Sequence, residues 1–161
     1  MRNPFLITLL LLSVVGLSAG SPHKRHRPSP VITLERTVCF GACPIYKIAI
    51  FADGRVDYQG IRFVKRMGKA SSRISRAQLE QLVAEFTNND YFKLDDSYTP
   101  GAKGCPQAAT DMPSAITSLT WRGKTKTIKH YHGCTGADVL ETLTRLEAKI
   151  VDAVNVTRWT K

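Results

Sequence analysis

The feature that most restricts the fold of this chain is a pair of strand-like segments joined by Asp53-Gly54. Residues 45–52 (IYKIAIFA) and 55–63 (RVDYQGIRF) are rich in β-branched and aromatic residues, and they flank the dipeptide directly. Asp-Gly supplies the positive φ angles that a two-residue hairpin turn requires. We therefore predict an antiparallel β-hairpin here, and with it a β-sheet.

Further strands are expected on either side of this hairpin. Residues 31–37 (VITLERT) alternate in polarity, which indicates a strand. Residues 114–121 and 125–133 predict a second hairpin, with its turn around Arg122-Gly123-Lys124. The segments expected to be loops are 64–73, which is basic, and 93–113, which is long and rich in Pro and Gly.

Two amphipathic helices are expected, one after each run of strands. The first begins at Ser75, because Ser75 and Gln78 have the spacing of a capping box, and it ends near residues 88–89. The second is capped by Thr135 and runs to about Ala153. Apolar residues recur at helical spacing on one face of each helix: Leu79, Leu82, Val83 and Phe86 in the first, and Val139, Leu143, Leu146, Ile150 and Val154 in the second.

The element order β-β-β-α-β-β-α predicts an α+β fold. We expect an antiparallel sheet of about five strands, with the two amphipathic helices packed on one face. Residues 31–161 are enough for a single domain with its own hydrophobic core.

The first thirty residues are predicted to lie outside that domain. Residues 1–20 have the form of a bacterial export signal, with Arg2 followed by an apolar core and small residues. Residues 21–30 (SPHKRHRPSP) have the composition of a disordered, basic spacer. Cleavage after residue 20 would give a periplasmic or secreted protein with no stable membrane insertion. The alternative is that the signal is retained as an anchor.

The chain is basic: 23 Lys and Arg residues stand against 13 Asp and Glu residues, for a net charge of +10 at pH 7. A positive surface attracts anionic neighbours, so the expected partner is an unknown envelope protein or an anionic component of the cell surface. Nucleic acid is not expected, because the chain has no reader motif and is predicted to be exported. The alternative is that the charge only keeps the protein, which we expect to be a monomer, in solution.

All four cysteines fall within the predicted domain, and an even number in an oxidising compartment predicts disulfides. Only three residues separate Cys39 from Cys43, and Gly41 permits a tight turn between two strands. We therefore favour a Cys39–Cys43 bond, with Cys105 bonded to Cys134. The crossed pairings stay open.

The C-x-x-x-C-P pattern at 39–44 has a second interpretation. Copper-delivery proteins of the Sco kind carry this pattern and bind metal with a distant histidine, so Cys39 and Cys43 with His130 or His132 could form a copper or thiol-redox site. In those proteins the second cysteine opens a helix whose dipole activates the thiol. Here Pro44 leads into a predicted strand, so we favour the disulfide and expect no cofactor.

Two further candidate sites were weighed against structural roles. His130 and His132 lie on one side of a strand, where they could share a metal ion, but a packed pair is the favoured interpretation. Asp111 precedes the second hairpin, where Asp more often bonds backbone amides than acts as a general base. The chain has no recognisable catalytic motif, so we expect that it is not an enzyme.

Three segments carry a resemblance to a known family: CFGACPIYKIAIFADGRVDYQG, TDMPSAITSLTWRGKTKTIKHYHGC and LTRLEAKIVD. They resemble a family of bacterial exported domains that has C-F-G-x-C-P-x-Y and T-D-x-P motifs and no known function. The resemblance implies one compact α+β domain and no particular activity. The residues whose importance it implies are Cys39, Cys43, Pro44, Tyr46 and Asp111.

Together these features predict an exported, disulfide-stabilised domain that binds a partner and catalyses no reaction. We expect its binding face at the loops 38–44 and 100–113. The candidate contact residues there are Phe40, Gly41, Pro44, Tyr46 and Asp111.

Overall fold

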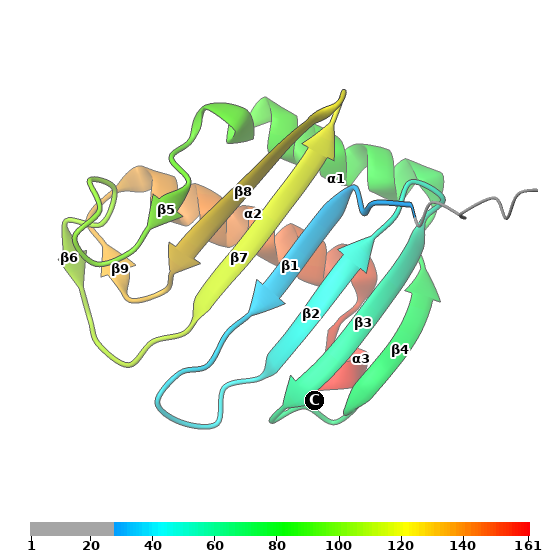
Figure 1. Ribbon diagram of the computed structural model, residues 1–161, viewed down its shortest axis with the longest axis horizontal. Helices are drawn as coiled ribbons and strands as arrows, with labels where there is room; N and C mark the ends of the chain where they lie inside the picture. The colour runs from blue at the N-terminus through cyan, green and yellow to red at the C-terminus, as the bar shows by residue number, and fades with distance from the viewer. Residues whose placement is uncertain (1–27) are drawn as a thin grey trace, which may run out of the picture.

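In the computed structural model, which describes residues 28–161, a seven-stranded sheet packs against two long helices (Figure 1). The predicted export signal and most of the spacer lie outside the described residues. The strand order is β4-β3-β2-β1-β7-β8-β5, and all neighbours are antiparallel except β5 and β8. Helices α1 and α2 cover one face of the sheet, and no described element covers the other (Figure 1).

The element bounds agree closely with the predicted ones. The strands of the main sheet are β1 (Ile32–Arg36), β2 (Ile45–Ile50), β3 (Arg55–Arg62), β4 (Gly68–Arg73), β5 (Ser97–Tyr98), β7 (Ser114–Trp121) and β8 (Lys124–Tyr131). A separate two-stranded sheet pairs β6 (Gln107–Ala108) with β9 (Cys134–Thr135). The helices are α1 (Arg76–Asn88), α2 (Asp138–Val154), the short α3 (Thr157–Thr160) and a 3₁₀ turn at Tyr91–Lys93.

The predicted α+β class, with both helices on one face, is confirmed, but the prediction of about five strands is too low. Strand β4 was expected to be a loop because its sequence, GKASSR, lacks large β-branched and aromatic residues. It forms because it is an edge strand whose backbone pairs with β3 along its whole length. The two-residue strands β5, β6 and β9 are too short to leave a pattern in the sequence.

The first hairpin is present, but its turn is longer than predicted. Only Gly54, with φ 80°, is in the left-handed region, whereas Asp53 is not. The Gly54 N–H donates to the Phe51 carbonyl, and the Phe51 N–H donates to the Arg55 carbonyl. Three residues therefore separate Phe51 from Arg55, in place of a two-residue turn. In the second hairpin both Arg122 and Gly123 have positive φ, as a two-residue turn requires.

The two helices begin in different ways. Ser75 caps α1 as predicted, with its hydroxyl accepting from the Gln78 N–H and the Gln78 side chain accepting from the Ser75 N–H. The predicted Thr135 cap of α2 is wrong. The N-cap residue is Ala137, which has no side-chain hydrogen bond, because Thr135 is used in the β9 pairing.

The hydrophobic core lies between the helices and the covered face of the sheet. Inward residues alternate along the strands, as in Ile32 and Leu34 of β1, and all four predicted apolar residues of α1 are buried. On α2 the stripe begins at Leu140, because Val139 is only partly buried. This core lies under the main sheet, and the connecting loops emerge at the ends of its strands.

Candidate functional site

Three loop segments meet at one end of the sheet, the lower end in Figure 1. They are residues 37–44 between β1 and β2, residues 61–67 at the β3–β4 turn, and residues 109–113 before β7. We call these three segments together the loop edge. Antiparallel pairing brings them to the same end, because β1, β3 and β8 run toward it and β2, β4 and β7 run away from it.

The segment 37–44 is fixed by a disulfide and by its neighbour. Cys39 and Cys43 are bonded to each other, and Gly41 between them has φ 143°. The Phe40 N–H donates to the carbonyl of Asp111 at 3.0 Å, which ties this loop to the segment before β7. The hydroxyl of Thr37 accepts from the Ser114 N–H at 2.8 Å. The two loops predicted to form a binding face are therefore joined to each other.

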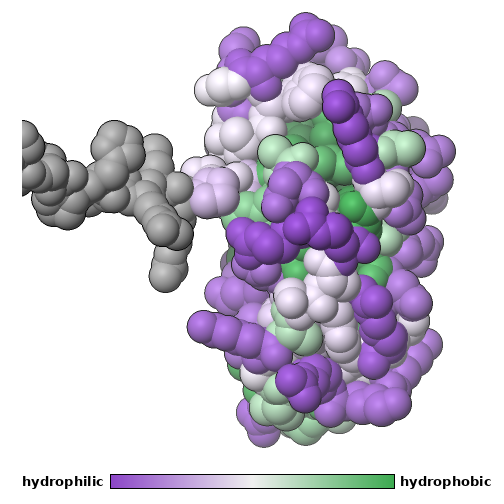
Figure 2. Space-filling model, turned by 90° about the vertical axis from the view of Figure 1, so that its right-hand side faces the viewer, coloured by the Kyte–Doolittle hydropathy of each residue, from purple (hydrophilic) through white to green (hydrophobic). Residues whose placement is uncertain are grey.

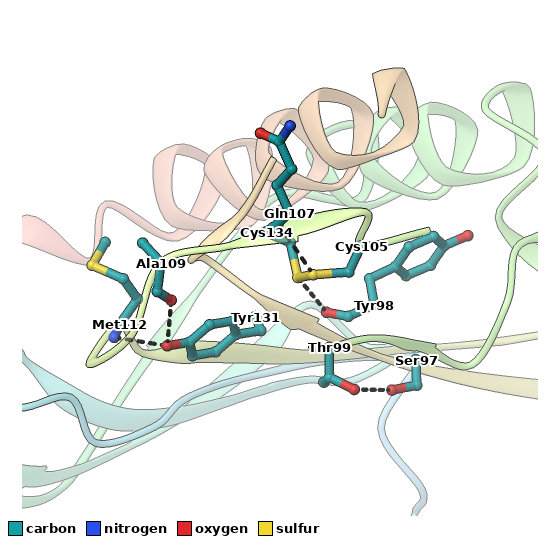
Figure 3. The surroundings of a disulfide bond; sticks show 9 residues. All are labelled: Ser97, Tyr98, Thr99, Cys105, Gln107, Ala109, Met112, Tyr131 and Cys134. Atoms are coloured by element: carbon teal, nitrogen blue, oxygen red, sulfur yellow. Dashed lines mark hydrogen bonds between the residues drawn. A yellow bond between two sulfur atoms is a disulfide. The ribbon is translucent and has the colours of Figure 1, made fainter. Parts of the chain in front are cut away.

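The segment 109–113 is held by the side chain of Tyr131 of β8. The Tyr131 hydroxyl donates to the Ala109 carbonyl at 2.9 Å and accepts from the Met112 N–H at 3.1 Å, so it bridges the loop (Figure 3). The His132 N–H also donates to the carbonyl of Pro113. These bonds fix the backbone on both sides of Asp111, which has the left-handed φ of 69°.

The second disulfide lies beside this segment. Cys105 and Cys134 are bonded, as favoured from the sequence, and both are buried (Figure 3). The bond joins the long loop after β5 to β9, and Gln107 and Ala108 pair with Thr135 and Cys134 immediately beyond it. The long loop is therefore pinned at its middle, close to where it enters the loop edge.

The loop edge carries most of the large, exposed apolar side chains in the part of the chain that the structure describes. Among the described residues, seven large hydrophobic side chains are exposed, and six of them lie on this edge: Val38, Phe40, Ile61, Phe63, Met67 and Met112. Phe40, at the tip of the disulfide loop, is 88% exposed. The seventh, Trp121, lies at the β7–β8 turn at the opposite end. Figure 2 views the β4 side, on which the largest hydrophobic area lies in the upper half and smaller hydrophobic areas lie at the lower end, among hydrophilic residues.

Positive charge accompanies these apolar residues. Arg62, Lys65 and Arg66 are exposed at the β3–β4 turn, and none of them forms an ion pair with another described residue. The guanidinium of Arg62 lies over the Phe63 ring, 4.6 Å from its centroid. The Arg66 N–H donates to the Trp159 carbonyl, which anchors this turn to α3.

The structure places four of the five candidate contact residues on the loop edge. Phe40, Gly41, Pro44 and Asp111 are exposed there. Tyr46 is not a surface residue, because it points into the core from β2 and packs against Tyr58, with ring centroids 5.9 Å apart. Asp111 contributes its backbone carbonyl, and its carboxylate accepts from the neighbouring Thr110 hydroxyl instead of from a backbone amide.

A buried polar cluster lies behind the loop edge, under the sheet. The carboxylate of Glu147 on α2, only 1% exposed, accepts hydrogen bonds from His130 Nδ1 at 2.8 Å and from His132 Nε2 at 2.7 Å. Arg36 Nη1 donates to the same carboxylate at 2.9 Å. Arg36 is the last residue of β1, His130 belongs to β8 and His132 directly follows β8, so three elements meet at one carboxylate.

The electrostatics of the cluster keep Glu147 ionised. Burial acts to raise the pKa of Glu147, but the hydrogen bonds from His130 and His132 and the charge of Arg36 outweigh it and lower the pKa to about 2. Burial raises the pKa of the adjacent Tyr46, against the opposing charge of Arg36. The cluster is therefore a carboxylate and a guanidinium that compensate each other, with two imidazoles directed at the carboxylate.

The cluster is also where metal-ligating side chains gather. Within residues 28–161, the one group of three or more such residues is His130, His132 and Glu147, whose ligand atoms all lie within 4.8 Å of one another. Cys39 and Cys43 do not belong to it, and each sulfur is bonded to the other. The histidines lie on the same side of β8, as predicted, with ring centroids 4.8 Å apart.

The sequence analysis did not identify Arg36 and Glu147 as site residues, although the pattern around each one contains a signal. Arg36 continues the inward alternation of Ile32 and Leu34 along β1. Glu147 lies four residues after Leu143 and three before Ile150, so it interrupts the apolar stripe of α2. A single acid and a single base at core positions of different elements indicate a buried pair.

The comparisons with known proteins place the chain in a family but assign it no activity. No helix within the described residues has the length and apolar character needed to cross a membrane. A search of curated proteins found no match. A family model described as "Domain of unknown function (DUF6438)" matches residues 30–153, which include the whole sheet, both disulfides and the Glu147 cluster. The chain therefore belongs to the DUF6438 family of domains of unknown function.

Proposed function

We propose that this protein is an exported, non-catalytic interaction domain that binds an acidic protein partner through its loop edge. The observation that supports this most is the segregation of exposed apolar side chains, six of seven of which lie on that edge. Monomeric proteins expose few clustered apolar residues, so such a cluster is typical of an interaction surface. The signal-like N-terminus and the two disulfides support export to the periplasm or beyond.

The construction of the edge favours a protein partner over a lipid surface. All three segments are held by backbone hydrogen bonds, and one also by a disulfide, so Phe40 is presented on a preformed loop. Preorganisation lowers the entropic cost of ordering an interface, and a few aromatic anchors then supply most of the binding energy. A lipid surface would gain nothing from such fixed spacing. The unpaired Arg62, Lys65 and Arg66 favour a partner that carries carboxylates around an apolar groove.

Site-specific photo-crosslinking tests this proposal. A photoreactive amino acid would replace Phe40 in one variant and Trp121, the exposed aromatic at the other end, in a matched control. In cells that produce the protein, we expect one discrete adduct from position 40 and none of that mass from position 121. The adduct should disappear when Val38→Asp and Met112→Asp are added.

The opposite outcomes would overturn the proposal. Equal adducts from both positions would mean that crosslinking is non-specific. The lack of any protein adduct from position 40 would mean that no protein partner binds the loop edge. A second arm would sediment the purified protein with vesicles of phosphatidylglycerol and phosphatidylcholine. If vesicle binding is strong and Phe40→Ala abolishes it, the edge is a lipid-binding surface and the protein-partner proposal is wrong.

A further inference from the structure

Strand β4 forms an open edge of the main sheet. It is the last strand in the order β4-β3-β2-β1-β7-β8-β5, and no described element lies beyond it (Figure 1). At the opposite edge, β5 pairs with β8, and the Lys129 N–H donates to the Asp96 carbonyl at 2.9 Å. Within residues 28–161, β4 is the longest strand that has a neighbour on one side only.

The register of β4 determines which of its backbone groups point away from the sheet. The Ile74 N–H, directly after β4, donates to the Gly54 carbonyl at 2.9 Å, and these two residues continue the register of β3 and β4. Along an antiparallel ladder, hydrogen-bonded pairs alternate with non-hydrogen-bonded pairs. The residues of β4 that bond to β3 are therefore Gly68, Ala70 and Ser72. The residues that direct their N–H and C=O groups outward are Lys69, Ser71 and Arg73.

These outward backbone groups are almost unused. Within the described part of the chain, the one hydrogen bond to them runs from the Arg66 guanidinium to the Lys69 carbonyl, at 3.4 Å. The strand pairs with β3 over all six residues without a bulge, and most of its side chains are small. A regular edge with free donors and acceptors is a template on which another strand can pair.

Positive charge marks this edge. The three side chains that leave β4 on the uncovered face of the sheet, Lys69, Ser71 and Arg73, are all exposed. Among residues 28–161, Lys69 has no ion-pair partner, and Arg73 reaches only Asp53, at 3.7 Å. The exposed Arg66 lies just before the strand. Acidic residues opposite these cations would add cross-strand attraction to the pairing of an incoming strand.

The same charges disfavour a second copy of this chain as the incoming strand. In an antiparallel pair of β4 strands, a two-fold axis at Ser71 places Lys69 of one copy opposite Arg73 of the other. An axis at Ala70 places the two Lys69 residues diagonally across from each other, and an axis at Ser72 does the same for the two Arg73 residues. Like charges that face each other across a pair of strands are destabilising. The edge therefore favours an acidic strand from a different protein.

We propose that β4 binds an extended acidic segment of another protein, which adds to the main sheet as a further strand. Alternate acidic side chains of that segment lie beside Lys69 and Arg73, on the uncovered face. The side chains between them lie beside Gly68, Ala70 and Ser72, on the helix side, where β4 has only small side chains and Ala70 packs against the core. The site begins where the loop edge ends, but strand addition does not depend on the function proposed above.

Amide hydrogen exchange of the full chain, measured by nuclear magnetic resonance, tests this proposal. The probe is a capped six-residue peptide of alternating Glu and Val, which matches the length of β4. In the free protein, exchange should be fast at Ser71 and slow at Ala70 and Ser72. Saturating peptide should slow the exchange at Ser71 by about tenfold or more. Protection of Ser71 without peptide, or no change with it, would overturn the proposal.

N-methylated peptides provide matched controls for the backbone pairing. Alternate amides of an added strand face its neighbour, so methylation of one set, the Glu amides or the Val amides, should abolish binding. Methylation of the other set should leave binding intact. Equal effects of the two sets, measured by fluorescence anisotropy of labelled peptides, would mean that the peptide does not bind as a strand and would overturn the proposal.

A charge reversal on the protein tests the preference for an acidic segment. Lys69→Glu should weaken binding of the Glu-Val peptide by about fivefold or more. Lys124→Glu is the matched control, because Lys124 is also exposed on a strand but lies at the opposite end of the sheet, at the β7–β8 turn. Equal losses in the two variants would mean general attraction by charge and would overturn the proposal. Near-ultraviolet circular dichroism would confirm that both variants are folded.

Discussion

Glu147 is the residue on which the interior polar contacts of this protein converge. An isolated carboxylate at 1% exposure would be strongly destabilising, because burial removes its hydration. Three side chains from β1, β8 and the residue after β8 offset that cost: Arg36, His130 and His132. The same contacts fasten α2 to the sheet directly behind the loop edge. Loss of any one partner leaves the buried carboxylate with fewer contacts to offset its desolvation.

The first prediction concerns how the free energy of unfolding changes as the pH falls below about 5. Because the pKa of Glu147 falls from its ordinary 4.5 to about 2 on folding, its contribution is fully present above about pH 5 and is lost as the pH falls toward 2. That contribution is about 3 kcal/mol. Urea unfolding of the protein between pH 2 and pH 7 should show this loss, whereas the Glu147→Gln variant should be less stable at pH 7 and should lose less stability in acid. Parallel curves for the two proteins would contradict the assignment.

The second prediction separates surface from core aromatics. Phe40 is 88% exposed, so Phe40→Ala should change the free energy of unfolding by no more than about 0.5 kcal/mol. Phe86 is fully buried and packs edge-on against Tyr91, so Phe86→Ala should cost about 3–5 kcal/mol. Chemical denaturation measures both. A large loss in Phe40→Ala would mean that this side chain serves the fold and is not kept for binding.

At the scale of elements, the predictable parts of the fold are those whose signal is local. The β7 bounds and the α1 cap follow from alternation and from the Ser75–Gln78 pattern, both of which depend only on neighbouring residues. Strand β4 depends on pairing with β3, and the start of α2 depends on Thr135 being used in β9. These features arise from contacts between residues far apart in the sequence. The hydrophobic periodicity of a single segment carries no information about such contacts.

The same distinction holds for the candidate site. The apolar, disulfide-closed loop 37–44 was visible in the sequence, whereas its hydrogen bond to Asp111 joins residues far apart along the chain. Met67 was predicted to lie in a plain basic loop and Phe63 at the end of a strand, because nothing local places either residue on the same edge as Phe40. Tyr46 was named as a candidate contact residue, although strand alternation with Ile48 and Ile50 puts it in the core.

The third prediction tests the helix starts. Ser75→Ala removes the capping box of α1 and should lower the free energy of unfolding by about 1 kcal/mol. Thr135→Ala is the matched control, since Thr135 has the sequence pattern of a cap but no capping bond, and it should cost much less. Thermal and urea unfolding of the two variants would decide. Equal losses would mean that Thr135 does cap α2.

At the scale of the whole molecule, the two disulfides have different tasks. Cys105–Cys134 spans 29 residues and joins the long loop to β9, whereas Cys39–Cys43 spans four and fixes the shape of one loop. The entropy that a disulfide removes from the unfolded chain grows with the length of the loop that it closes. The Cys105–Cys134 bond should therefore contribute more to the free energy of unfolding. The Cys39–Cys43 bond should contribute more to binding at the loop edge.

The fourth prediction follows from that division. Replacement of Cys105 and Cys134 by Ala should lower the free energy of unfolding by about 3–4 kcal/mol, against about 2 kcal/mol for the Cys39 and Cys43 pair, on the chain-entropy model. Denaturant unfolding of both double variants measures this difference. The Cys39 and Cys43 variant should in turn lose most of the position-40 crosslink. The reverse order of stability would mean that the long loop is held by other contacts.

The central claim is that the loop edge is covered by a partner where the protein works, and hydroxyl-radical footprinting measures this most directly. The protein would be oxidised in the cells that make it and again after purification, and labelling would be compared residue by residue. We expect protection in cells at Val38, Phe40, Phe63 and Met112, with Trp121 labelled equally in both samples. Equal labelling of the edge in the two samples, or protection confined to Trp121, would contradict it.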